Sequence, residues 1–114
     1  MAFNFSANTG YLWKEMPFLD RIRSAKKHGF HSVELHDEAH FEDLGDLKSL
    51  LKEVGLPVNS MNIRMGPSFG CAAIPDHQHI AQHDIREAAR LAQEIGAKAS
   101  HILSGFSEQT PEAF

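Results

Sequence analysis

The sequence contains few of the features that mark specialised classes of protein. Cys71 is the single cysteine among 114 residues, which excludes a disulfide within the chain. No run of about 18 apolar residues occurs, and the N-terminal segment MAFNFSANTG lacks the basic start and apolar core of a secretory signal. The net charge is −4, which disfavours a nucleic-acid binder. We therefore expect a cytoplasmic protein with neither a membrane nor a nucleic-acid partner.

Three segments have the apolar spacing of amphipathic helices, and a glycine follows each of them. Glycine is preferred where a helix ends in a left-handed residue, so these glycines predict the three helix ends. The helices are expected at 17–28 before Gly29, 42–54 before Gly55 and 77–95 before Gly96. Pro17 suits the first helical position, and Asp76 is the expected N-cap of the third helix.

Four short apolar segments alternate with these helices and predict strands. They are AFNFSAN (2–8), FHSVELH (30–36), LPVNSMNI (56–63) and AKASHILSG (97–105). The resulting order βαβαβαβ favours an α/β fold with a parallel sheet, built as a single domain over residues 1–114. It fits either a small open sheet or half of a (β/α)8 TIM barrel, which typically has about 250 residues. The final segment FSEQTPEAF is either a loop or the start of a fourth helix, for which Thr110 and Pro111 would be the N-cap and the first helical residue.

Polar residues at the ends of the predicted strands are candidates for a substrate pocket, because ligands bind at the C-terminal ends of barrel strands. Asn8, Asn62, Arg64 and Ser104 occupy such ends. Arg64 is attractive because a guanidinium binds a carboxylate through two hydrogen bonds, although a surface role is the alternative.

Two further candidates lie in the second predicted strand and one in the fourth. Glu34 and His36 alternate to the same side of their strand, and a carboxylate inside a strand needs a compensating partner. Their alternatives are a hydrogen-bonded core residue or an exposed edge. His101 fits a pocket residue and a core histidine equally well.

The stretch DHQHIAQHD (76–84) resembles a metal site, but its surroundings favour a hydrated helix face. His79 and His83 are four residues apart and share that face with Arg86 and Arg90. Two cationic side chains beside a bound cation are unfavourable. We therefore predict a hydrated helix face rather than a metal site in this stretch. The sequence also lacks a Gly-rich phosphate loop, a Ser-His-Asp order and a Cys-x-x-Cys pair, so we predict no catalytic residue.

Three longer segments carry a family resemblance. They are FSANTGYLWKEMPFLDRIRSAKKHGFHSVEL (5–35), LLKEVGLPVNSMNI (50–63) and CAAIPDHQHIAQHDIREAARLAQEIGAKASHILSG (71–105). In order, they contain an Ala-Asn strand end, an aromatic turn, an F-L-x-R helix start, a G-F-x-x-V-E strand and a strand ending in Asn. With these motifs the chain resembles the N-terminal half of the hydroxypyruvate isomerase family, in the xylose-isomerase-like barrel superfamily.

The resemblance implies a (β/α)8 barrel that interconverts aldoses and ketoses, or hydroxypyruvate and tartronate semialdehyde. The implied Mg²⁺ or Mn²⁺ is held by carboxylates on later strands, so this chain alone is expected to hold no metal and to be an inactive fragment. Its substrate would be a small hydroxy-carbonyl compound. The loop RMGPSFGCAAIP (64–75) replaces a longer loop of many relatives, which leaves the substrate preference open.

Half a barrel leaves two strand edges unpaired, and such edges pair readily with another chain. We therefore expect a homo-oligomer. The alternatives to an isomerase fragment are a non-catalytic self-associating α/β module and a small-molecule binder. A barrel rebuilt from two copies is less favoured, because both copies would lack the later carboxylates.

Overall fold

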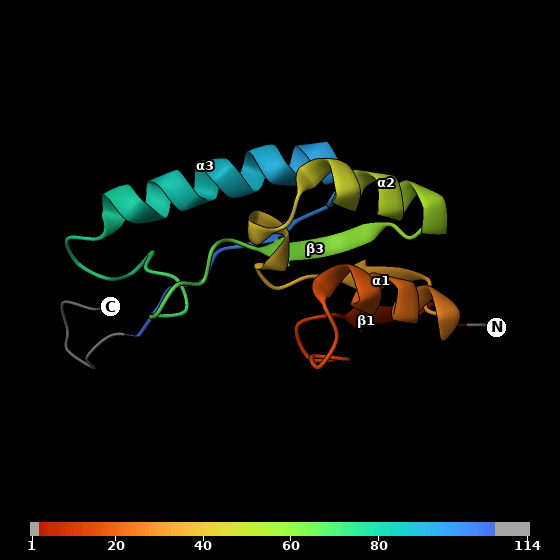
Figure 1. Cartoon of the computed structure of the whole chain (residues 1–114). Helices are drawn as coiled ribbons and strands as arrows, with labels where there is room; N and C mark the ends of the chain where they lie inside the picture. The colour runs from red at the N-terminus through yellow and green to blue at the C-terminus, as the bar shows by residue number, and fades with distance from the viewer. Residues whose placement is uncertain (1–2, 107–114) are drawn as a thin grey trace.

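The computed structural model describes residues 3–106, within which strands and helices alternate as predicted (Figure 1). In chain order the elements are β1 (Ser6–Asn8), α1 (Phe18–Lys27), β2 (Ser32–Glu34), η1 (Glu38–Phe41), α2 (Leu44–Val54), β3 (Val58–Asn62), α3 (Gln78–Ile95) and β4 (Ser100–His101). The short 3-10 helix η1 lies between the second predicted strand and the second predicted helix, where the sequence predicts no regular element. The helix start predicted at Thr110 and Pro111 lies outside the described residues.

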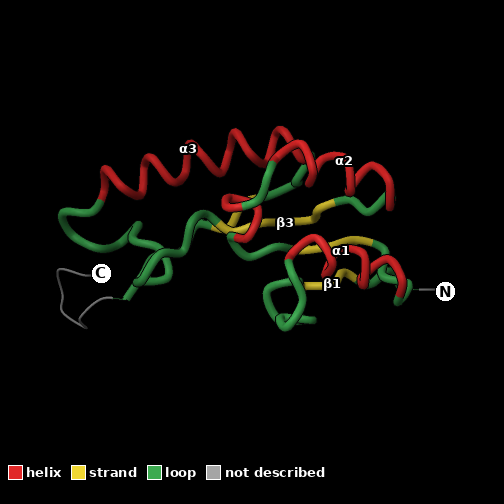
Figure 2. The backbone as a smooth tube through the Cα atoms, in the orientation of Figure 1, coloured by secondary structure: helices red, strands yellow, loops and turns green. Residues whose placement is uncertain are grey.

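The four strands form one parallel sheet in the order β1-β2-β3-β4 (Figure 2). Neighbours in the sheet are also neighbours in the chain, and right-handed crossovers then place every connecting helix on the same side. Contacts of α2 with both α1 and α3 agree with this arrangement. The sheet has the topology of half a (β/α)8 barrel, which confirms the predicted α/β fold class.

The core fills the space between the helices and the sheet. Its fully buried side chains come from strands and helices alike, and the largest are Ile22, Val33, Leu35, Leu47, Val58, Met61 and Ile63. Burying an aliphatic side chain of this size stabilises the fold by about 1.5–3 kcal/mol. Because the core occupies the helix side of the sheet, the polar strand residues are left for the opposite side.

The predicted helix ends are confirmed, whereas all three predicted starts shift. Pro17, expected at the first helical position, is instead the N-cap of α1, because its ψ of 152° is extended rather than helical. Gly55 and Gly96 are C-caps with left-handed φ angles of 69° and 73°. The second helix begins at Leu44, because the Asp43 carboxylate accepts a hydrogen bond of 2.8 Å from the backbone N–H of Asp46.

The prediction that Asp76 caps the third helix is wrong. An N-cap residue normally has an extended backbone, but Asp76 has a φ of 66°. The cap position falls on His77, which makes no side-chain capping bond. Farther along this helix His79 and His83 are exposed, as expected for its hydrated face.

Among the described residues, no helix is long and apolar enough to cross a membrane.

Candidate functional site

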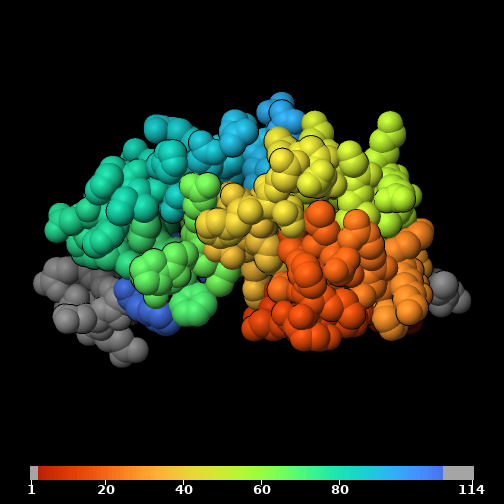
Figure 3. Space-filling view, viewed as in Figure 1, coloured from red at the N-terminus to blue at the C-terminus, as the bar shows by residue number. Residues whose placement is uncertain are grey.

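A cavity of about 530 Å³ opens on the side of the sheet opposite the helices, at the C-terminal ends of the strands. We call it the sheet pocket. Its lining comprises Asn8, Gly10, Tyr11, Lys14, Glu34, Leu35, His36, Ser60, Asn62, Met65, Phe69, His101 and Leu103. Figure 3 shows the molecule hollowed between the turn after β1 and the segment after β3. All four strands contribute to the pocket, as expected at the mouth of a barrel.

Five of the six predicted pocket residues meet in this cavity, and the strand pairing explains why. Asn8 pairs with Glu34 across β1 and β2, and Asn62 pairs with His101 across β3 and β4. His36 follows two residues after Glu34 and also lines the cavity. Parallel strands in register bring their C-terminal ends to one edge, so the strand-end rule selects residues that are distant in sequence.

Arg64 does not join this group, and neither does Ser104. Arg64 lies two residues beyond the end of β3, and its guanidinium is 5.8 Å from the centre of the Phe41 ring. It lines a second cavity, described below. Ser104 instead forms an isolated antiparallel bridge with Gly70. The strand-end rule fails for both because their chain segments have left the sheet.

Glu34 is the single carboxylate among the described residues that line the sheet pocket. It is half-buried, and the hydroxyl of Ser60 donates a hydrogen bond of 3.2 Å to its Oε1 atom. The other carboxylate oxygen, Oε2, accepts no hydrogen bond from the described residues. The nearby amide of Asn8 is engaged in a turn, since its Oδ1 accepts from the N–H of Gly10 at 2.9 Å. Glu34 is therefore oriented by one partner and still has an oxygen free for a ligand.

The turn after β1 forms the wall beside His36. The Tyr11 ring meets the His36 ring edge-on, with 4.7 Å between centroids. Gly10 lies so close to that imidazole that a Cβ atom there would overlap it. Glu38 and Arg21 hold the turn from behind: the hydroxyl of Thr9 donates to Glu38 at 2.8 Å, and Arg21 donates to the Thr9 carbonyl at 3.1 Å. The wall is thus fixed by hydrogen bonds with η1 and α1.

Several lining residues escaped the sequence reasoning. Ser60 had a usable signal, because it alternates with Asn62 and so shares its side of β3. Tyr11 and Lys14 had none, since they lie in a turn whose path follows no periodic pattern. Met65 and Phe69 belong to the loop after β3 and were equally inaccessible to pattern reasoning.

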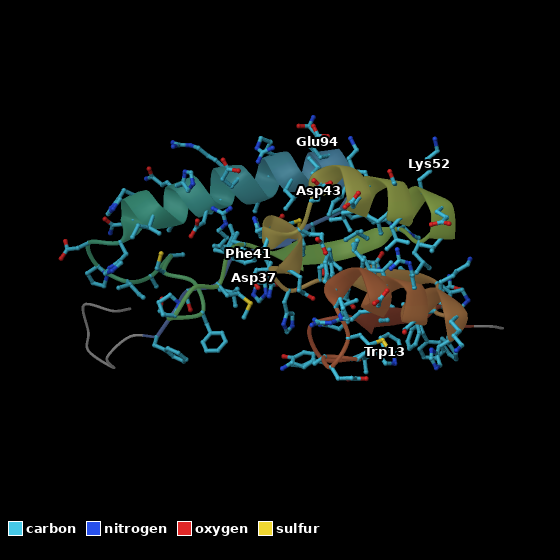
Figure 4. All side chains as sticks on the ribbon, in the orientation of Figure 1. Trp13, Asp37, Phe41, Asp43, Lys52 and Glu94 are labelled. Carbon is cyan, nitrogen blue, oxygen red and sulfur yellow. The ribbon has the colours of Figure 1, made fainter. Side chains whose placement is uncertain are left out.

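His40, in η1, lies behind the sheet pocket and contacts its wall. Its Nε2–H donates to the Asn62 carbonyl at 3.0 Å. Burial lowers the pKa of His40 below its ordinary value of 6.5, and the positive charge of Arg64 acts in the same direction. The Asn62 carbonyl and the carboxylates of Asp37 and Asp84 partly oppose this shift. Figure 4 shows Asp37 in this region, where its carboxylate accepts from a backbone N–H at 2.9 Å.

The described residues do not fit a divalent-cation site. Mg²⁺ and Mn²⁺ prefer several oxygen ligands, usually including carboxylates. The sheet pocket offers one carboxylate, Glu34, and its lining also includes the amine of Lys14. Within residues 3–106, no group of three or more His, Cys, Asp or Glu side chains is arranged to hold a metal ion. The expectation that the family's metal is held by other strands stays a prediction.

A second cavity, of about 480 Å³, lies between η1, the loop after β3 and the start of α3. We call it the loop pocket. Its lining comprises Phe41, Arg64, Met65, Gly66, Pro67, Ser68, Gly70, Cys71, Ile74, His77, Ile80 and Asp84. Met65 alone is shared with the sheet pocket among the described lining residues.

Fold and site together define a class: a parallel half-barrel with a polar pocket at the C-terminal ends of its strands. No family model matches the chain. It is 34% identical over 104 residues to a 2-oxo-tetronate isomerase from Haemophilus influenzae, which covers 88% of the chain and 40% of that protein. It is 32% identical over 108 residues to a protein of Xenopus laevis named "Putative hydroxypyruvate isomerase", which covers 89% of the chain and 38% of that protein.

The chain is therefore a homologue, over nearly all its length, of the 2-oxo-tetronate and hydroxypyruvate isomerases, and the predicted resemblance is confirmed. It spans about 40% of the length of these curated relatives.

Two solved structures share the fold of the chain. A protein from Brucella melitensis described as AP endonuclease, family 2, superposes with a TM-score of 0.85 at 27% identity, covering 93% of this chain and 42% of that one. A 3-keto-D-glucoside 4-epimerase from E. coli superposes with a TM-score of 0.71 over 99% of this chain and 43% of that one. The latter is 19% identical and supports the fold alone.

Proposed function

We propose that this chain forms one wall of the substrate pocket of a hydroxypyruvate isomerase-like enzyme, which acts on a small hydroxy-carbonyl compound. The observation that carries the proposal is the convergence of five polar residues at the C-terminal ends of four parallel strands. They are Asn8, Glu34, His36, Asn62 and His101. The homology to isomerases of this type supports the same assignment.

The proposed reaction moves one proton between adjacent carbon atoms and another between their oxygen atoms, so a hydroxy ketone becomes a hydroxy aldehyde. In this proposal the amides of Asn8 and Asn62 bind substrate oxygens, and the ammonium group of Lys14 attracts a substrate carboxylate. Glu34 accepts a hydrogen bond from a substrate hydroxyl through its free oxygen. These residues bind and orient the substrate, and we assign no proton transfer to them.

The proposal includes a Mg²⁺ or Mn²⁺ cofactor and the proton-transferring carboxylates, both supplied by segments outside this chain. We therefore expect the 114-residue chain to be inactive alone. The direct measurement is an assay with hydroxypyruvate and either Mg²⁺ or Mn²⁺. Turnover by the chain alone would contradict the assignment of catalysis to other segments.

Binding tests the pocket itself. In an NMR titration with hydroxypyruvate, we expect shifts at the sheet pocket and at least a tenfold loss of affinity in Glu34→Gln. Glu53→Gln is the matched control, because Glu53 is exposed on α2. Equal affinity in both variants would show that Glu34 does not contact the substrate.

The alternative function is a non-catalytic module or binder that self-associates. A specific observation favours self-association: the outer strands β1 and β4 have exposed apolar neighbours. Phe3 and Phe5 are 74% and 62% exposed, and Ile102 is 48% exposed. We therefore also propose a homo-oligomer formed through these edges, in a cytoplasmic setting. Light scattering after gel filtration measures the mass, and a monomer at high concentration would contradict the oligomer.

A further inference from the structure

The loop pocket has the size and lining of a small-molecule site. Its volume of about 480 Å³ lies within the range of ligand pockets, about 300–1,000 Å³. Most of its polar groups are already engaged. The Ser68 hydroxyl donates to the Gly70 carbonyl at 2.6 Å, and His77 Nδ1 is 3.0 Å from the Pro75 carbonyl. Apolar side chains such as Ile74 and Ile80 form much of the remaining wall.

Asp84 is the exception on the α3 side of this pocket. Its side chain lies on the buried face of the helix, and the residue is only 9% exposed. Among residues 3–106 it forms no hydrogen bond and no ion pair. The Asp84 carboxylate does affect one neighbour. The pKa of the Cys71 thiol is raised, first by burial and second by the negative charge of Asp84. Asp84 lines the cavity and has no partner among the described residues, so its carboxylate is available to bind a cationic group of a ligand.

Arg64, in the segment after β3, is a second residue of the loop pocket whose polar group is not engaged by the described residues. It forms no ion pair within the described residues, including with Asp84, although both line the same cavity. Its Nε atom is buried and has no hydrogen-bond partner. Phe41 lies beneath the guanidinium, 5.8 Å from ring centre to Cζ, and is labelled in Figure 4. Within residues 3–106, Arg64 and Asp84 are thus a cation and an anion that line this pocket without an ion-pair partner.

The wall between these charges is fixed by contacts with the segment after β4. The N–H of Ala73 donates to the Ser104 carbonyl at 3.0 Å. Gly70 lies against the backbone of Leu103, where no Cβ atom would fit, and Gly105 lies equally close to Gly70. A cavity held in this way is formed before a ligand arrives, which reduces the entropic cost of binding.

We propose that the loop pocket binds a small zwitterion with an apolar body, such as an apolar α-amino acid, with its ammonium group on Asp84 and its carboxylate on Arg64. The positive charge of Arg64 would repel a simple amine, and the negative charge of Asp84 would repel a simple carboxylate. A zwitterion satisfies both charges and places its side chain against the apolar wall. None of the five strand-end residues takes part, so this proposal is independent of the isomerase assignment.

The test is an NMR titration of the 114-residue chain with L-phenylalanine and L-leucine. Phenethylamine and 3-phenylpropanoate serve as half-probes, since each lacks one charged group. We expect shifts confined to the loop after β3, η1 and the first half of α3, and at least tenfold weaker binding of either half-probe. Half-probes that bind as well as phenylalanine would overturn the proposal, and so would the absence of binding at millimolar concentrations.

Variants identify the contacts. Asp84→Asn and Arg64→Met should each weaken phenylalanine binding at least tenfold. Asp46→Asn and Arg86→Met are matched controls, because both residues are exposed on helix surfaces and should retain the parent affinity. Unchanged affinity in Asp84→Asn would overturn the assigned ammonium site.

Stability without ligand provides a second measurement. If Asp84 has no partner, Asp84→Asn should leave the urea midpoint unchanged or raise it. If Arg64 and Asp84 instead pair with each other in solution, both single variants should lower the midpoint, and their effects in the double variant should not add. That second outcome would overturn the proposal, because the two charges would already be neutralised.

Discussion

The sheet pocket and the loop pocket are similar in size but differ in how they are built. The sheet pocket collects polar side chains from four strands, and its carboxylate, Glu34, already accepts a hydrogen bond from Ser60. The loop pocket collects apolar side chains from a loop, η1 and α3, and its two charged residues, Arg64 and Asp84, have no ion-pair partner among the described residues.

The two pockets therefore illustrate two ways in which a fold builds a binding site. Strand ends place many hydrogen-bonding groups at fixed spacing, which suits a polar ligand. A loop packed over a helix encloses apolar space, where an unpaired charge interacts strongly with a ligand because little water competes. His40 lies between the two regions, since it hydrogen-bonds to Asn62 and responds to the charges of Arg64 and Asp84.

The largest expected effect comes from Gly70→Ala, which should break the loop pocket alone. Gly70 has a φ of 83°, and its added Cβ atom would collide with the backbone of Leu103. We expect a loss of about 3 kcal/mol in the free energy of unfolding, from backbone strain and overpacking together. Urea denaturation measures this loss.

Gly66→Ala is the matched control in the same loop. Gly66 has a φ of 59° but open space around its Cβ position, so it should lose about 1 kcal/mol. Equal losses in the two variants would mean that the contact with Leu103 is not closely packed.

The next largest effect is expected from Gly10→Ala, which should disturb the sheet pocket and leave the loop pocket intact. The added Cβ atom would overlap the His36 ring, which is the end of a side chain and can move. We expect about 1–2 kcal/mol of destabilisation and a displaced His36 resonance in NMR spectra. Gly45→Ala is a suitable control, because Gly45 lies in α2 and its Cβ position meets only the end of the Asp43 side chain. An unchanged His36 resonance would argue against the close approach of the turn.

The smallest expected effect is a dependence on pH carried by His40. Its folded-state pKa is lowered from 6.5, so the unfolded chain binds a proton first as the pH falls. The stabilising contribution is therefore complete above pH 6.5 and decreases as the pH falls below that value. The slope from this one group is at most about 1.4 kcal/mol per pH unit.

His40→Gln should remove this part of the slope when urea midpoints are compared between pH 5 and 7. The exposed residue His79 provides the control, and His79→Gln should keep the parent slope. A slope that is the same in both variants would indicate that His40 is as accessible as His79.

The sequence predicted the fold well where the signals were local. Glycine after an apolar stripe ended α2 and α3 at the expected residues, because left-handed backbone favours glycine strongly. Asp76 failed as a cap, since its backbone conformation depends on how the loop after β3 returns to α3. Strand ends and strand alternation together predicted five lining residues of the sheet pocket. The strand-end rule failed for Arg64 and Ser104, whose chain segments have left the sheet.

By itself, the sequence determined the order of elements, the parallel sheet and the polar strand ends, because periodic burial and short connections leave few topologies open. Only the tertiary structure decided which residues outside the strands complete each pocket. The turn that brings Tyr11 to His36 is held by Arg21 and Glu38, which lie on other elements. Asp84 belongs to the histidine-rich stretch 76–84, yet it is buried on α3 and lines the same cavity as Arg64. Such placements depend on packing between distant segments, which no local pattern records.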